Sequence, residues 1–126
     1  MMFNNVIEVS KANNIKESIN KLKSSNSTFK LHKIWYQGLE NLPSKYESCL
    51  KSWSTMYPQQ CILLWNSISI TTLLQVEYPN LIDIYNSFEM IQRIDLAKYM
   101  ILNTFGGLYT DMDQECLKKL NIDSIM

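Results

Sequence analysis

Two aspartates near the end of the chain form the pattern with the clearest chemical meaning. Asp111 and Asp113 flank Met112 in a segment, 108–113, whose residues predict a strand. Side chains alternate along a strand, so both acids would share one face with Tyr109, their Cα atoms about 7 Å apart. Carboxylates this close repel each other unless a cation compensates, and oxygen ligands suit Mg²⁺ or Mn²⁺ held partly by a phosphate-bearing substrate. The alternative is a pair of solvated acids in a turn after the strand.

A second charged pair lies in the helix that would precede this strand, predicted at 89–105. The apolar side chains of that helix form one stripe along its length: Ile91, Ile94, Ile101, Leu102 and Phe105. Asp95 and Lys98 fall inside the stripe, so we expect a largely buried helix that carries two charges. Charged residues are seldom buried unless they are paired or functional. A structural ion pair at i, i+3 and a role in ligand binding both fit this pattern.

An aromatic residue at the end of an earlier strand offers a surface for a ligand. Residues 31–36 predict a strand that ends at Gln37 and Gly38, with Trp35 near its carboxyl end. Ligands of α/β folds bind at this edge of the sheet, so the indole either stacks on a nucleotide base or packs in the core. His32, in the same strand, has no metal partner at a useful spacing, and we interpret it as a structural histidine with satisfied hydrogen bonds.

The elements that would position these residues alternate between strand and helix. They are a strand at 31–36, a helix between Pro43 and Tyr57, a strand at 61–65, two helices between Ile68 and Phe88 divided by Pro79, a helix at 89–105 and a strand at 108–113. Gly106 and Gly107 end the last helix. This order is typical of an α/β domain with a parallel sheet. We place that domain at 29–126 and interpret 1–28 as a short helix or tail followed by a linker.

The composition limits the class of protein. Of 126 residues, 46% are hydrophobic and 19% are charged, which excludes wholesale disorder. Twelve basic and twelve acidic side chains cancel, so there is no positive excess to bind nucleic acid. Three widely spaced cysteines fit neither a disulfide framework nor a thiolate metal site. The sequence has no apolar run near the roughly 20 residues of a transmembrane helix and no signal peptide, so we expect a cytoplasmic protein.

Taken together, these segments resemble the glycosyltransferase sugar-binding region that contains the DXD motif. The resemblance covers about residues 29–125. Its parts are Leu31-His32-Lys33-Ile34-Trp35-Tyr36-Gln37-Gly38, Leu42-Pro43, Tyr46 with Cys49-Leu50-Lys51-Ser52-Trp53, Tyr57-Pro58, Leu64-Trp65-Asn66, Asp95-Leu96-Ala97-Lys98-Tyr99-Met100-Ile101-Leu102 and Gly106-Gly107-Leu108-Tyr109-Thr110-Asp111-Met112-Asp113. Their order, and the short spacing from Asp95 through the glycines to the acid pair, make the set specific.

This resemblance implies a GT-A type, Rossmann-like fold for nucleotide-diphospho sugars and a metal-dependent transfer that retains the anomeric configuration. The catalytic set that it implies is Asp95, Lys98, Asp111 and Asp113. Trp35 would stack on the base, while Asp95 and Lys98 would contact the donor. Asp111 and Asp113 would bind the ribose and the metal–diphosphate, with Mn²⁺ or Mg²⁺ as the cofactor, and Tyr109 would shape the pocket. The implied partners are a UDP- or GDP-sugar and a glycan, lipid or protein acceptor.

The domain of this family continues well beyond its acid pair. The resemblance therefore implies that this chain is the first half of such a domain, truncated after the DXD strand. An incomplete sheet leaves a strand edge or an apolar face uncovered, so we expect self-association or a partner chain. Two other functions fit the residues. One is a non-catalytic remnant or subunit that binds sugar nucleotides, and the other is a structural α/β module whose acid pair is incidental.

Overall fold

The fold is built on one parallel sheet. A computed structural model describes residues 5–9, 17, 19–21 and 30–117. Its strands are β1 (Val6–Glu8), β2 (Leu31–Ile34), β3 (Ile62–Trp65) and β4 (Leu108–Tyr109). They lie in the order β1-β3-β2-β4 in a four-stranded sheet, and every pairing is parallel. The predicted α/β class with a parallel sheet is confirmed.

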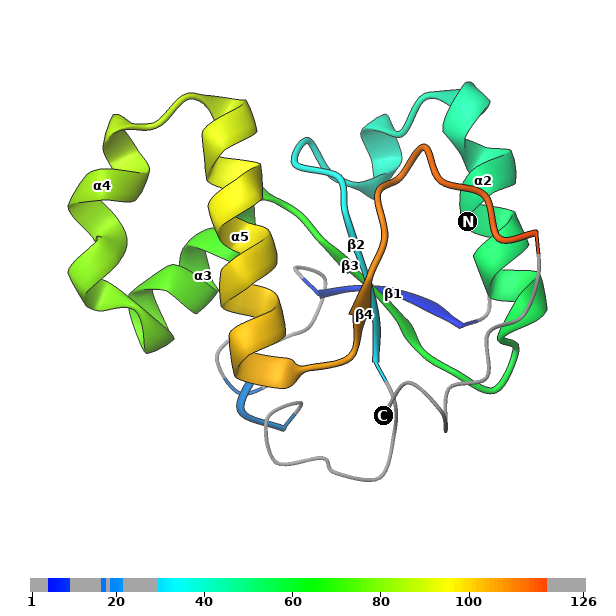
Figure 1. The fold of residues 1–126 in the computed structure, drawn as a ribbon, viewed down its shortest axis with the longest axis horizontal. Helices are drawn as coiled ribbons and strands as arrows, with labels where there is room; N and C mark the ends of the chain where they lie inside the picture. Colours follow the sequence, from blue (N-terminus) through cyan, green and yellow to red (C-terminus); the bar gives the residue numbers. More distant parts are fainter. Residues whose placement is uncertain (1–4, 10–16, 18, 22–29, 118–126) are drawn as a thin grey trace.

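Helices cover both faces of this sheet. They are α2 (Ser44–Met56), α3 (Ser67–Glu77), α4 (Ile82–Ser87) and α5 (Met90–Phe105), with the short 3-10 helices η2 (Leu39–Asn41) and η3 (Pro79–Leu81). Figure 1 shows α2 on one side of the sheet and α3, α4 and α5 on the other. Each helix predicted between residues 43 and 105 is present, and Pro79 begins the 3-10 turn that separates α3 from α4.

Two apolar clusters, one on each face, hold the sheet in place. β2 and β3 are buried along their whole length, as the continuous apolar run of β3 predicts. Alternation sends Ile62 and Leu64 into the cluster beneath α2, and Leu63 and Trp65 into the cluster shared with α3 and α5. Because both faces are covered, a ligand can reach this sheet at the ends of its strands.

Strand β1 was not predicted from the sequence. Val6–Glu8 pairs in parallel with β3, but a run of three residues is too short to show the alternation that identifies a strand. Glu8 is buried, and its carboxylate accepts hydrogen bonds from the Leu39 backbone N–H (2.7 Å) and the Asn66 side chain (3.0 Å). The helix expected within residues 1–28 falls mainly outside the described residues, although Ile19 is fully buried in the core.

The last strand is shorter than predicted, and the acid pair does not lie on it. β4 is two residues long, Leu108–Tyr109. The chain then leaves the sheet because Gln114 engages both backbone groups of Asp111. The Gln114 side chain accepts from the Asp111 N–H (2.8 Å), and the Gln114 N–H donates to the Asp111 carbonyl (3.1 Å). The expectation that Tyr109, Asp111 and Asp113 share one strand face is therefore wrong.

Helix α5 is less buried than its composition predicts. Of its residues, Ala97, Met100 and Ile101 are buried. In contrast, Ile91 and Leu102 from the predicted apolar stripe are exposed. α5 packs against α3 and β4, and these contacts leave its opposite side open within the described part of the chain. The prediction that this helix is largely buried is thus wrong.

Three features of the chain concern the expected class of protein and its expected self-association. No helix among the described residues is both long and apolar enough to cross a bilayer. Cys49, Cys61 and Cys116 are free thiols. The apolar residues in 118–126, on which the expected self-association partly rests, lie outside the described residues.

Candidate functional site

A glycine pair makes the tight connection between α5 and β4. Gly106 and Gly107 have φ angles of 67° and 94°, in the left-handed region that favours glycine. A Cβ atom on Gly107 would lie 2.2 Å from the Lys30 carbonyl oxygen, whereas one on Gly106 would meet nothing within 4 Å. The close approach to the backbone before β2 therefore requires glycine at position 107. The pair fixes the helix that carries Asp95 and Lys98 relative to the strand that leads to the acids.

His32 fastens the same connection to the sheet. Its side chain is 1% exposed, and the Trp65 indole N–H donates to Nδ1 (3.0 Å). The ring proton therefore lies on Nε2, which donates to the Gly106 carbonyl (2.9 Å). Burial lowers the pKa of His32 from 6.5 to about 4, against the opposing effect of the Gly106 hydrogen bond, so the ring is neutral at pH 7. The interpretation as a satisfied structural histidine is confirmed.

Asp95, Lys98 and Asp111 form one charged network between α5 and the acid turn, as we call residues 111–114. Lys98 Nζ lies 3.3 Å from Asp95 Oδ1 and 3.3 Å from Asp111 Oδ1. It also lies 5.3 Å from the ring centroid of Tyr109. The i, i+3 ion pair that the sequence left as one alternative is present, and the structure extends it to a third residue. The network therefore connects α5 to the acid turn and is not confined to one helix.

The members of the network influence one another's ionisation. Partial burial acts to lower the pKa of Lys98, but the hydrogen bonds and charges of Asp111 and Asp95 outweigh it and raise that pKa. Burial, together with the charge of Asp111 and a hydrogen bond to it, raises the pKa of the Tyr109 hydroxyl well above its ordinary value. At neutral pH the site thus offers an ammonium between carboxylates and a protonated phenol, groups suited to phosphate and sugar oxygens.

Packing and side-chain hydrogen bonds, and not sheet pairing, anchor the acid turn. Met112, between the two aspartates, is buried in the cluster beneath α2. The Trp53 indole N–H, from α2, donates to the Gln114 carbonyl (2.8 Å). Figure 1 shows the chain after β4 running across from α5 toward α2. The turn therefore directs Asp111 toward Lys98 of α5 while its centre is anchored beneath α2.

A buried lysine beneath the acid turn was not identified from the sequence as a site residue. Lys33 of β2 is 1% exposed, its Nζ donates to the Asp111 carbonyl (2.9 Å), and it lies 4.8 Å from the ring centroid of Trp53. Burial lowers the pKa of Lys33 from 10.5 to about 8, although the nearby Cys49 and Asp111 oppose the change. The ammonium therefore stays charged at pH 7. Strand alternation, which places Lys33 on the α2 face, was the one signal available.

A pocket of about 600 Å³ opens beside the charged network. It is lined by Asp95, Lys98, Tyr99, Leu102 and Tyr109. Tyr99 and Leu102 were not predicted site residues, because Tyr99 is a surface position on a helix and Leu102 belonged to a stripe expected to face the core. Tyr99 is in fact 72% exposed. A pocket lined by both charged and apolar side chains suits a sugar, which presents both hydroxyls and C–H faces.

Asp113 lies in the acid turn but does not line this pocket. Its carbonyl accepts a hydrogen bond from the Cys49 thiol (3.7 Å), and the residue is exposed. Among the described residues, no three His, Cys, Asp or Glu side chains gather as a metal-ligand group. A divalent cation here would have Asp111 and Asp113 as its protein ligands. This oxygen-only set fits Mn²⁺ or Mg²⁺ that takes its remaining ligands from phosphate and water.

Trp35 lies just after β2, at the carboxyl edge of the sheet. It is half-buried, and its indole N–H donates to the Asn41 carbonyl (3.3 Å). Its ring packs against Tyr46 with 5.4 Å between centroids. The structure does not include Trp35 in the lining of the pocket beside Lys98. Its role in stacking on a base stays a prediction.

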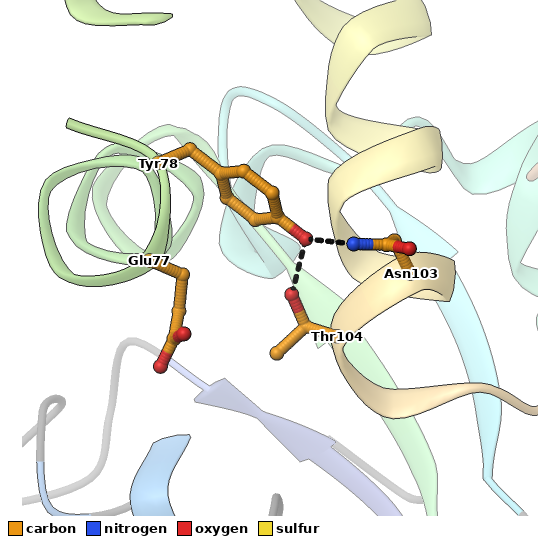
Figure 2. Close-up of a pocket in the computed structure, with 4 residues that line it drawn as sticks. All are labelled: Glu77, Tyr78, Asn103 and Thr104. Atoms are coloured by element: carbon orange, nitrogen blue, oxygen red, sulfur yellow. Dashed lines mark hydrogen bonds between the residues drawn. The ribbon is translucent and has the colours of Figure 1, made fainter. Parts of the chain in front are cut away.

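A second pocket, of about 270 Å³, lies between α3 and α5. It is lined by Glu77, Tyr78, Asn103 and Thr104 (Figure 2). The Tyr78 hydroxyl accepts from the Asn103 side chain (2.8 Å), lies 2.7 Å from the Thr104 hydroxyl and donates to the Met100 carbonyl (3.2 Å). Figure 2 shows the Glu77 carboxylate pointing away from this hydroxyl. Because these polar groups bond one another across two helices, we interpret the pocket as a helix junction and not as a ligand site.

Comparison with known proteins identifies a family. Residues 43–126 match the family described as "Glycosyltransferase sugar-binding region containing DXD motif". The matched segment includes α2, α5, the charged network and the acid turn. The resemblance inferred from the sequence motifs is therefore confirmed.

Curated relatives extend this finding. The chain is 33% identical over 96 residues to an uncharacterized glycosyltransferase of Acanthamoeba polyphaga mimivirus, covering 71% of this chain and 37% of that protein. It is 29% identical over 114 residues to a mannosyl phosphorylinositol ceramide synthase of Saccharomyces cerevisiae, covering 83% and 30%. It is 30% identical over 94 residues to the initiation-specific alpha-1,6-mannosyltransferase of the same yeast, covering 69% and 20%. The chain thus spans between a fifth and a little over a third of the length of these relatives. No solved structure matches it.

Proposed function

Because the chain belongs to the family of the glycosyltransferase sugar-binding region containing the DXD motif, we propose that it binds a nucleotide-diphosphate sugar and transfers the sugar to an acceptor. The donor is a UDP- or GDP-sugar, the cofactor is Mn²⁺ or Mg²⁺, the fold is of the GT-A type and the anomeric configuration is retained. The observation that carries the proposal is the placement of Lys98 between Asp95 and Asp111, on the wall of a pocket.

Departure of the nucleoside diphosphate is the step that most needs stabilisation. As the bond between the anomeric carbon and the diphosphate breaks, negative charge grows on the phosphate oxygens while the sugar becomes oxocarbenium-like. The Lys98 ammonium, whose charged form Asp111 and Asp95 stabilise further by raising its pKa, donates to those oxygens. Asp111 and Asp113 would hold the divalent cation, which when bound supplies Lewis-acid stabilisation of the same charge.

Orientation of the donor falls to the remaining site residues. Asp95 is exposed at the pocket and accepts hydrogen bonds from sugar hydroxyls, which fixes the direction of the anomeric carbon. Tyr109 keeps its proton and lines the pocket wall. Trp35 stacks on the base at the carboxyl end of β2.

The names of the relatives support a finer proposal for the sugar. Two of the yeast relatives are named for mannosyl transfer, one of them to form mannosyl phosphorylinositol ceramide. We therefore propose mannose as the transferred sugar, with a lipid or a glycan as the acceptor. The expected cytoplasmic location and self-association stay predictions.

Calorimetric titration tests this function directly. GDP, UDP and their mannose and glucose conjugates are titrated into the protein with Mn²⁺, with Mg²⁺ and with a chelator. We expect cation-dependent binding, and we expect Asp113→Asn to weaken it at least about tenfold with the fold intact, because the cation loses an anionic ligand. Loss of the charge repulsion between the acids leaves the cation-free protein at least as stable.

Asp83→Asn provides the matched control, since it makes the same chemical change at an exposed acid in the first turn of α4. Unchanged cation-dependent binding in Asp113→Asn, or an equal loss in Asp83→Asn, would contradict the role of Asp113. A wild-type protein that binds none of these nucleotides would refute the proposed function. Binding without turnover in the presence of acceptor lipids and glycans would instead identify the non-catalytic sugar-nucleotide-binding protein.

A further inference from the structure

We propose that Lys33 is a positioning residue that sets the direction of the two carboxylates in the acid turn. The inference rests on the proposed function, because it concerns how those acids meet a cation and a diphosphate. Lys33 does not line the pocket beside Lys98. It acts through the main chain of Asp111, to which its Nζ donates at 2.9 Å.

The position of this contact relative to the sheet supports a role for Lys33 in holding the acid turn. β2 and β4 pair in register at Leu31 with Leu108 and at His32 with Tyr109, and main-chain bonding to β2 extends to the Thr110 N–H, which donates to the His32 carbonyl (3.2 Å). Lys33 is the next residue of β2, and its side chain bonds the Asp111 carbonyl just beyond that hydrogen bond. A side chain therefore continues the attachment of the chain to β2 where main-chain pairing stops.

The contact completes the fixation of the backbone at Asp111. The Asp111 N–H donates to the Gln114 side chain (2.8 Å), and the Asp111 carbonyl accepts from both Lys33 and the Gln114 N–H. Met112 is anchored by burial immediately afterwards. The backbone on both sides of the Asp111–Met112 peptide is therefore held. The side chains of Asp111 and Asp113 consequently have fixed directions as well.

The chemistry of the side chain also favours this role over simple space filling. Burying an ammonium is costly, and a methionine of similar length would fill the same apolar space without that cost. Lys33 compensates with the Asp111 carbonyl and with the face of Trp53, 4.8 Å from its Nζ. The charges of Asp111 and Asp113 stabilise the ammonium, and these two carboxylates repel each other when no cation is present.

The substitution Lys33→Met removes the donor and the charge while keeping the length of the side chain. Two measurements follow: hydrogen exchange of the amides in 111–114, and calorimetric titration of GDP or UDP with Mn²⁺. We expect the exchange rates to rise at least about tenfold and the Mn²⁺-dependent affinity to fall at least about tenfold. The sign is informative, because loss of a positive charge alone would tighten cation binding.

Ile62→Val is the matched control, because it trims the same cluster beneath α2 and leaves every hydrogen-bonding group of the turn in place. Lys33→Gln, which keeps a shorter donor, serves if the methionine variant fails to fold, and should change both quantities by a smaller factor. Exchange in 111–114 equal to that of Ile62→Val, or Mn²⁺-dependent affinity that is unchanged or tighter, would overturn the role of Lys33. If the wild-type protein binds no Mn²⁺–nucleotide, the proposed function fails, and the exchange rates alone decide whether Lys33 holds the turn.

Discussion

His32 should make the stability of this fold sensitive to acid. Its buried ring uses both nitrogens as a neutral imidazole, with Nδ1 accepting from the Trp65 indole N–H. A second ring proton would have to lie on Nδ1, where it would face that donor. Burial lowers the pKa of His32 from 6.5 to about 4. Between these two values the unfolded chain binds a proton that the folded chain excludes, so stability falls as the pH falls.

The magnitude follows from the difference between the two pKa values. A gap of about 2.5 units, at about 1.36 kcal/mol for each unit, corresponds to about 3 kcal/mol of the free energy of unfolding. This contribution is fully present above pH 6.5, is about 2 kcal/mol smaller at pH 5, and is lost completely below about pH 4. Small domains have only about 5–15 kcal/mol of stability in total, so the change is large.

Urea unfolding between pH 8 and pH 5 measures this effect when the wild type is compared with His32→Gln. Glutamine offers a donor and an acceptor and does not titrate, and all carboxylates are common to both proteins, so the difference between the curves isolates His32. We expect the wild type to lose about 2 kcal/mol more than the variant over this range. His32 is the only histidine of the sequence, so NMR of its ring protons also reports its pKa without ambiguity. A constant difference between the two proteins, or a folded pKa near 6.5, would refute the reasoning.

Two further predictions concern the frame of the site and the base contact. Gly107→Ala should lower the free energy of unfolding by about 1–3 kcal/mol more than Gly106→Ala, because both have positive φ but a Cβ at 107 alone meets a backbone oxygen, at 2.2 Å; equal losses in denaturant unfolding would contradict this. Trp35→Ala should weaken calorimetric binding of a nucleoside diphosphate by about 1–3 kcal/mol, whereas Tyr46→Ala, which removes the packing partner of the indole, should weaken it less. A Trp35→Ala protein that binds normally but loses about 3–5 kcal/mol of stability would assign the indole to the core.

The elements that could be predicted from the sequence are those with local signals. Pro43 immediately precedes α2, and Gly106 immediately follows α5, as the restricted φ of proline and the permissive φ of glycine predict. The continuous apolar run before Asn66 identified β3 as a strand buried on both faces. In each case the decisive property belongs to residues that are neighbours in the sequence.

The elements that could not be predicted depend on distant partners. β1 is defined by its pairing with β3 and is too short to show a pattern of its own. The acid turn forms because Gln114 and Lys33 occupy the backbone groups of Asp111, and strand alternation contains no information about either contact. The exposure of Ile91 depends on which side of α5 faces its neighbours, and the apolar stripe alone does not specify that side.

The candidate site likewise contains residues that the sequence predicts and residues that it does not. Asp95, Lys98, Tyr109 and Asp111 come together because two glycines connect α5 to β4, and that short connection is visible in the sequence. Tyr99 could not be assigned to the pocket, because an exposed tyrosine on a helix is common and the pocket wall forms from two elements. Its spacing from Lys98, one position along the helix, does not place both on one face in an isolated helix.

The two acids lie on a turn and not on the strand that the sequence predicts. This difference changes which contacts determine the positions of their carboxylates. On a strand, the ladder of main-chain hydrogen bonds would fix both carboxylates, and the rest of the fold would matter little to them. On the observed turn, Met112 and Trp53 tie the acids to the cluster beneath α2, while Lys98 ties Asp111 to α5 on the opposite side of the sheet. The proposed metal and diphosphate affinity would then be coupled to the packing of both helical layers. Substitutions of the two anchors themselves, Met112 or Trp53, should therefore weaken the proposed binding, whereas substitutions of equal cost between α3 and α4 should not.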